Sequence, residues 1–206
     1  MTFVDTDRSA LIRYSRWLLV FTLLYNVGEG IIAIGSGIVA GSIALVGFGL
    51  DSFIEVFAAG VLLWNFGNLI SGEEGHERTA RRVEAAIGVT FFALAAYITA
   101  EAVFILAGGS EPRESLVGIG LAVASLIIMP ALGLSKRNCA RRLCVSALER
   151  ESVETLVCSY LSITLVLGLV LNAAWGLWWA DPIAALAMVP YVLKEGWEAW
   201  QGEDDD

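Results

Sequence analysis

Ser42-Ile-Ala-Leu-Val-Gly-Phe-Gly-Leu-Asp51-Ser-Phe-Ile-Glu55-Val-Phe-Ala-Ala-Gly-Val-Leu-Leu-Trp64 is an apolar stretch that carries two acidic residues. It is long enough to cross a bilayer as a helix, which takes about 20 residues. A carboxylate at that depth costs about 2.5–3.5 kcal/mol, so a pair of them needs a reason. Asp51 and Glu55 are four residues apart and share one face of such a helix. Binding of a cation is the leading explanation.

The composition extends this interpretation to the whole chain. Of its 206 residues, 57% are hydrophobic and 17% are charged, and the mean hydropathy is +0.69. A soluble domain carries about 25% charged residues. The apolar residues also occur in runs of about 20, the length of a membrane-spanning helix. The sequence therefore predicts an all-α, polytopic integral membrane protein.

Six apolar segments predict six transmembrane helices in a single transmembrane domain spanning residues 1–206. The intervening segments are short, so consecutive helices are expected to be antiparallel neighbours in one bundle. Lys136–Arg150 is predicted as a basic loop, and Asp181 as the N-cap of the sixth helix, with Pro182 in its first turn. The predicted helices cover residues 15–39, 42–69, 83–106, 115–134, 153–177 and 183–197, and an acidic tail follows at 202–206.

The basic residues predict the orientation in the membrane. All 13 Lys and Arg residues except Arg113 fall in the N-terminal tail, loops or helix ends on one predicted side. The positive-inside rule makes that side cytoplasmic, so both termini are expected in the cytoplasm, with the protein in the plasma membrane. The net charge is −9, and each basic cluster is small and adjoins a helix end. Lipid headgroup contacts explain such clusters, and nucleic acid is not an expected partner.

Glu29, Glu101 and Glu154 also lie within predicted helices. Glu154 precedes Cys158 by four residues, so these two also share a helix face. At 1.5 Å per residue, Glu55 and Cys158 fall about 10 and 12 Å from the cytoplasmic face, which allows them to meet. Carboxylate oxygens suit hard divalent ions, whereas thiolate favours zinc. The candidate metal ligands are Asp51, Glu55, Glu154 and Cys158.

Each candidate also has a purely structural explanation. Asp51 and Glu55 can be neutral and hydrogen-bonded between helices. Glu154 can reach water at the inner rim, and Cys158 can fill a small apolar space.

Two acids outside this set have their own alternatives. Glu29 follows Asn26 by three residues, so the two can share a hydrogen bond or form a second polar station. Glu101 lies near the predicted outer end of the third helix and is expected to be solvated.

Two motifs together resemble the cation diffusion facilitator family of divalent cation efflux proteins. They are Ser42-Ile-Ala-Leu through Leu50-Asp51-Ser-Phe-Ile-Glu55, and Trp179-Ala-Asp-Pro-Ile-Ala-Ala-Leu186. Members are six-helix transporters with both termini in the cytoplasm, and most exchange zinc or manganese for protons. The resemblance covers the whole six-helix pattern and implies the same fold and activity. The family's cytoplasmic metal-binding domain has no counterpart in these residues. In this respect the chain resembles a short subgroup of the family.

The resemblance also implies where metal binds. The second helix of the family gives Asp or His and then Asp four residues later, and Asp51 and Glu55 stand at those places. The fifth helix usually gives His or Asp and then Asp. Here no Asp or His is present in that helix, so the expected ligands differ from those of a tetrahedral zinc site. The nearest match is Glu154 and Cys158, and Thr155 and Ser159 compete one residue along.

The leading function is a secondary transporter that moves a divalent metal cation, zinc-like or manganese-like, by proton antiport through a carboxylate site between the second and fifth helices. The metal ion is then the substrate, and no cofactor is required. The alternative is a non-transporting membrane module that binds metal or a partner, as a sensor or assembly protein. An enzyme is not expected, because the sequence has no HExxH motif and no intramembrane histidine pair.

The first predicted hairpin is rich in glycine, which lets helices approach closely. We read this as a sign of close helix packing and, further, of a homodimer held by helix contacts alone. The glycines concerned are Gly28, Gly30, Gly35, Gly37, Gly41, Gly47 and Gly49.

Overall fold

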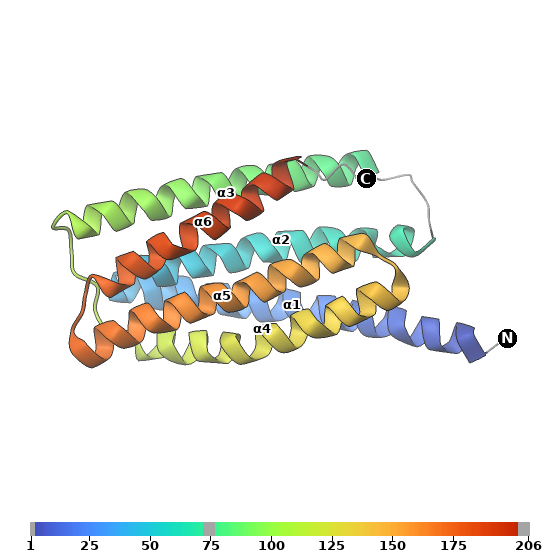
Figure 1. Cartoon of the computed structure of the whole chain (residues 1–206), viewed down its shortest axis with the longest axis horizontal. Coiled ribbons are helices and arrows are strands. Elements are labelled where there is room, and N and C mark those ends of the chain that lie inside the picture. Colours follow the sequence, from blue (N-terminus) through green and yellow to red (C-terminus); the bar gives the residue numbers. More distant parts are fainter. Residues whose placement is uncertain (1–2, 72–76, 202–206) are drawn as a thin grey trace.

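The computed structural model describes residues 3–71 and 77–201, with side chains described for 8–67 and 85–201. Its described part is a bundle of long helices without strands, which confirms the predicted fold class (Figure 1). The predicted acidic tail at 202–206 lies outside the described residues. The helices are α1 (Phe3–Ala40), α2 (Ile43–Ser71), α3 (Glu77–Leu106), α4 (Leu116–Leu143), α5 (Ser146–Trp175) and α6 (Ala180–Gln201).

The helices run antiparallel along the long axis of the bundle (Figure 1). α1 packs on α2, α4 on α5, and α3 on α6, and α2 also contacts α3, α5 and α6. The start of α1 and the end of α6 lie at the same end of the bundle as the α4–α5 turn (Figure 1). α2 is therefore the helix from which side chains can reach both α5 and the α3–α6 pair.

Polarity in the described residues is inverted relative to a water-soluble protein. Large apolar side chains such as Ile38, Phe57 and Ile127 are exposed, whereas Asn26 and Ser125 have no exposed surface. An apolar exterior of this extent is suited to lipid. α1 to α5 are long and apolar enough to cross a membrane. The sixth, α6, carries four charged residues and falls short by composition, yet it runs beside α3 and α5 in Figure 1.

The predicted basic loop at Lys136–Arg150 is wrong. α4 continues to Leu143 and α5 begins at Ser146, so the connection is a two-residue turn. The cause is Lys136, whose fully buried ammonium donates to Glu151 Oε1 at 2.6 Å and Thr155 Oγ1 at 2.9 Å. Sequence polarity marked this segment as water-exposed, but the ion pair allows both helices to extend through it.

Glycines bring the paired helices into contact. A Cβ on Gly37 of α1 would lie 2.9 Å from the backbone nitrogen of Val46, and one on Gly88 of α3 would lie 2.8 Å from the carbonyl oxygen of Gly196. The predicted close packing of the first hairpin is confirmed at Gly37. Gly35, in contrast, is exposed with no atom within 4 Å of its Cβ position, so it contributes nothing to this packing.

Asp181 has a different role from the predicted one. It lies within α6, which begins at Ala180, so it is not the N-cap of that helix. Its carboxylate instead receives the first donors of α2: Ser42 Oγ at 2.5 Å, Ile43 N at 3.0 Å and Ala44 N at 3.4 Å. An acid at a helix N-terminus accepts hydrogen bonds from the free N–H groups, and its negative charge interacts favourably with the positive end of the helix dipole. This contact fixes the end of α2 against α6.

Candidate metal site

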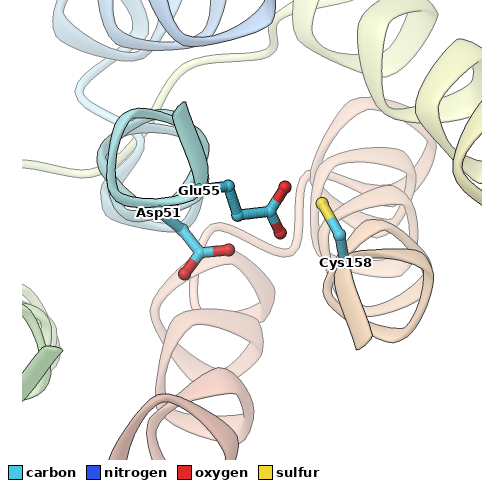
Figure 2. A group of neighbouring side chains, drawn as sticks. All are labelled: Asp51, Glu55 and Cys158. Carbon is cyan, nitrogen blue, oxygen red and sulfur yellow. The ribbon is translucent and has the colours of Figure 1, made fainter. Parts of the chain in front are cut away.

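Asp51, Glu55 and Cys158 converge in the interior of the bundle. Figure 2 shows both carboxylates extending from α2, with that of Glu55 directed toward the Cys158 sulfur on α5. One ligand atom from each residue lies within 4.8 Å of the others. Asp51 and Glu55 meet on one face because they are one helical turn apart. The sequence prediction that these two and Cys158 face one another agrees with this geometry.

The three groups are removed from solvent by the surrounding helices. Cys158 has no exposed surface, and Asp51 and Glu55 are 5% and 8% exposed. Asn26 of α1 donates from Nδ2 to Glu55 Oε2 at 2.6 Å. Such a bond orients the carboxylate of Glu55 beside Cys158. Asn26 therefore pairs with Glu55 and not with Glu29.

Glu154 occupies a separate position on α5. It does not belong to the three-residue group, but it lines a cavity of about 10 Å³ together with Asp51 and Glu55. A space of that size holds about one water molecule. Glu195 of α6 completes a set of four carboxylates around the cavity and is 8% exposed.

Glu195 was missed in the sequence because it lies near the charged end of α6. Its signal was periodicity: Met188 and Val192 precede it by seven and three residues, and both are buried. Residues at this spacing share a helix face, so Glu195 belongs to the inward face of α6.

The competing residues on α5, Thr155 and Ser159, do not belong to the three-residue group. Thr155 Oγ1 donates to the carbonyl oxygen of Glu151 and accepts from Lys136. The buried Oγ of Ser159 makes no hydrogen bond among the described residues. Cys158 is thus the α5 side chain that joins Asp51 and Glu55 in the three-residue group.

The other intramembrane acids are distinct from this group. Glu29 is 2% exposed and its Oε2 accepts a hydrogen bond from Ser52 Oγ at 3.0 Å. Glu101 is exposed, as predicted.

Two carboxylates and a thiol in a dry interior can hold a divalent cation. The carboxylates balance its charge, and the sulfur adds a soft donor that zinc accepts more readily than manganese. Burial of this charge without a cation is costly.

The fold defines the class as a polytopic, helical integral membrane protein, and this one carries buried acids in its interior. Residues 19–200 match the family described as the cation efflux transmembrane domain, so the chain belongs to the cation efflux family. This confirms the resemblance found in the sequence. The family transports metal cations across membranes, with the metal ion as substrate and not as cofactor, and its members are not enzymes. No curated protein shows significant sequence similarity to the chain.

Proposed function

We propose that this protein is a secondary transporter that exchanges a divalent metal cation, zinc-like or manganese-like, for protons at a site between α2 and α5. The observation that carries the proposal is the approach of Asp51, Glu55 and Cys158 to within 4.8 Å of one another in the bundle interior. Glu154 is the fourth candidate ligand, because it faces the same two acids across the cavity.

Protons and metal ions compete for the same oxygen atoms. A metal ligand must be deprotonated, so metal binding releases protons, and protonation releases the metal. The two acids of α2 are buried, and an uncompensated charge there is unfavourable. The site is therefore stable either with a metal ion or with protons. Exchange of one for the other on opposite sides of the membrane constitutes antiport.

A small cavity adjoins Asp51 and Glu55. Its walls come from α2, α3, α5 and α6, through residues such as Ala58, Phe91 and Val192. Glu154 and Glu195 stand beside Asp51 and Glu55 on this wall and attract cations toward them. In this proposal Glu154 holds the ion together with Asp51 and Glu55, which line the same cavity.

The test is metal flux in proteoliposomes that contain the purified protein. Uptake of zinc, manganese, iron, cobalt and cadmium is measured with and without a pH gradient. Uptake stimulated by the gradient is the expected result. Asp51→Asn and Glu55→Gln keep the side-chain size but remove charge that the ion requires, so both are expected to abolish transport at normal protein levels.

Glu101→Gln is the matched control, because it makes the same chemical change at an exposed position and is expected to be nearly silent. Wild-type rates in Asp51→Asn would show that the carboxylates are structural. Metal binding by the wild type without any flux would favour a sensor or assembly module.

A further inference from the structure

Glu195 is a buried carboxylate of α6 that lies beside the proposed metal site. It lines the α6 side of the cavity that Asp51, Glu55 and Glu154 also line. Among charged groups, Glu195 exerts the largest influence on Asp51 and on Glu154, which places it close to both. Glu195 is 8% exposed, and its Oε1 has no hydrogen-bond partner among the described residues. Buried polar atoms are normally paired, so an unpaired carboxylate oxygen at a cavity calls for an explanation.

The packing of α6 keeps Glu195 at this position. The next residue, Gly196, is buried against α3, where an added Cβ would lie 2.9 Å from Phe91 Cβ and 3.2 Å from the carbonyl oxygen of Gly88. Phe91 itself lines the cavity. α6 is therefore in close contact with α3 beside the site, which holds the backbone of Glu195 near the cavity.

The basic residues nearby are bound elsewhere. Lys194 Nζ lies 3.1 Å from Glu198 Oε1, and both of these side chains are about half exposed. Lys136 is bonded to Glu151. In the described part of the chain, no basic side chain forms an ion pair with Glu195. The cavity of about 10 Å³ holds about one water molecule, and a divalent ion without its water shell is no larger.

The donor atoms on the two sides of Asp51 and Glu55 differ. On one side lies the sulfur of Cys158. On the other side the cavity is lined by carboxylates and apolar or aromatic side chains, and Cys158 is not among its lining residues. Oxygen donors suit manganese and other hard divalent ions, whereas thiolate favours zinc. The site therefore has a sulfur side and an oxygen side.

The charge of a single divalent ion is compatible with this set of ligands. Such an ion balances two of the four carboxyl groups around the cavity. The other two, and the thiol of Cys158, are then expected to keep their protons, because uncompensated charge is costly in this interior. A protonated carboxyl group still presents an acceptor oxygen. All four acids can thus contribute oxygen atoms to one ion.

We propose that Glu195 is a metal ligand supplied by α6, and that the cavity beside it is the position of a hard divalent cation such as manganese. This rests on the proposed transport function and adds to it a ligand on a third helix. Zinc is held on the sulfur side by Cys158. Asp51 and Glu55 serve both ions, because they belong to the group with Cys158 and also line the cavity.

The experiment measures metal binding by the purified protein in detergent. Free manganese is followed by its electron paramagnetic resonance signal, and zinc by competition with a fluorescent chelator. Glu195→Leu removes both carboxylate oxygens and fills their space with an apolar side chain. Its Kd for manganese should rise about tenfold or more, since even a change in the surroundings of a metal ligand has an effect of that size. Its Kd for zinc should change much less.

Glu198→Leu is the matched control, because it makes the same change at an exposed position on the same helix and should keep both wild-type Kd values. An unchanged manganese Kd in Glu195→Leu, or an equal rise for both ions, overturns the proposal. Thermal unfolding checks that the variant is folded. If it is not, Glu195→Gln provides the same test, with a smaller rise that is again confined to manganese.

The transport function is tested separately. Asp51→Asn should weaken the binding of both ions. If it does so while Glu195→Leu is silent, the ligand role of Glu195 is wrong and the site between α2 and α5 stands. Selective loss of manganese binding in Glu195→Leu, together with no metal flux in wild-type vesicles, would support the ligand and contradict transport.

Discussion

Cys158 is the candidate ligand that sets this site apart at the scale of single residues. It replaces a hard donor with a soft sulfur, fully buried against Asp51 and Glu55. A thiolate adds much to the binding of zinc and little to the binding of manganese, so this one side chain influences which ion is preferred.

We expect Cys158→Ser to reduce zinc uptake more than manganese uptake. The zinc uptake rate should fall on the order of tenfold or more, because even the loss of a hydrogen-bond partner of a metal ligand has an effect of that size. Initial uptake rates in vesicles, normalised to protein level, measure both. Equal losses for the two ions would indicate that Cys158 only fills space. Cys144→Ser is the control, because Cys144 is exposed at the end of α4.

The Lys136–Glu151 pair provides a second prediction at this scale. Both side chains are buried and their atoms are 2.6 Å apart. Removal of one partner leaves an unpaired buried charge, so Lys136→Met and Glu151→Gln should each destabilise the protein by about 3–5 kcal/mol. The double variant should be more stable than either single one. Thermal unfolding in detergent tests this, and additive losses in the double variant would argue against the pair.

At the scale of helices, the structure differs from the sequence prediction where a polar side chain of one helix finds its bonding partners on another helix. The apolar runs were sufficient to predict six helices, because lipid requires each span to be apolar and hydrogen-bonded internally. The four-residue spacing of Asp51 and Glu55, and of Glu154 and Cys158, was sufficient to predict that each pair shares one helix face. The buried role of Lys136 did not, because its partners Glu151 and Thr155 belong to another helix and are not visible in local composition.

Asp181 illustrates the same limit and gives a prediction at this scale. Its carboxylate caps α2 from α6, so Asp181→Ala should lower stability by about 0.5–2 kcal/mol, the usual cost of losing a helix cap. Asp181→Asn retains an acceptor oxygen and should be milder. Glu114→Ala, at an exposed position beyond α3, is the control. Thermal unfolding provides the measurement, and a silent Asp181→Ala would contradict the capping role.

At the scale of the whole molecule, the glycines bear on assembly. Gly30, Gly37 and Gly49 are used inside the protomer, where their Cβ positions lie within 3 Å of neighbouring helix atoms. Gly35 remains exposed on α1 beside Ile31 and Ile38, and this surface is free for a second copy.

We therefore expect the homodimer, if formed by α1, to depend on Gly35. Gly35→Leu should reduce dimer formation without unfolding the protomer, because the added side chain meets open space there. Mass measurement and cross-linking in mild detergent report the oligomeric state. Gly37→Leu should instead disturb the α1–α2 contact and unfold the hairpin. A wild type that is monomeric at all protein concentrations would contradict the prediction.

The orientation in the membrane also belongs to this scale. The connection at 107–115, which contains the loop expected on the outer side, and the turn at Cys144 lie at opposite ends of the bundle (Figure 1). Gly109 is a poor place for a cysteine probe, because a Cβ there would lie 2.9 Å from the carbonyl oxygen of Phe104. The exposed neighbour Ser110 avoids this clash.

Ser110→Cys should react with an impermeant thiol reagent applied to intact cells, whereas native Cys144 should react only after permeabilisation. The reason is the excess of Lys and Arg at the Cys144 end of the bundle, which the positive-inside rule places in the cytoplasm. Cys139 and Cys158 are buried and should stay unlabelled in both conditions. Labelling of Cys144 in intact cells, with Ser110→Cys labelled only after permeabilisation, would show that the topology is the reverse of the predicted one.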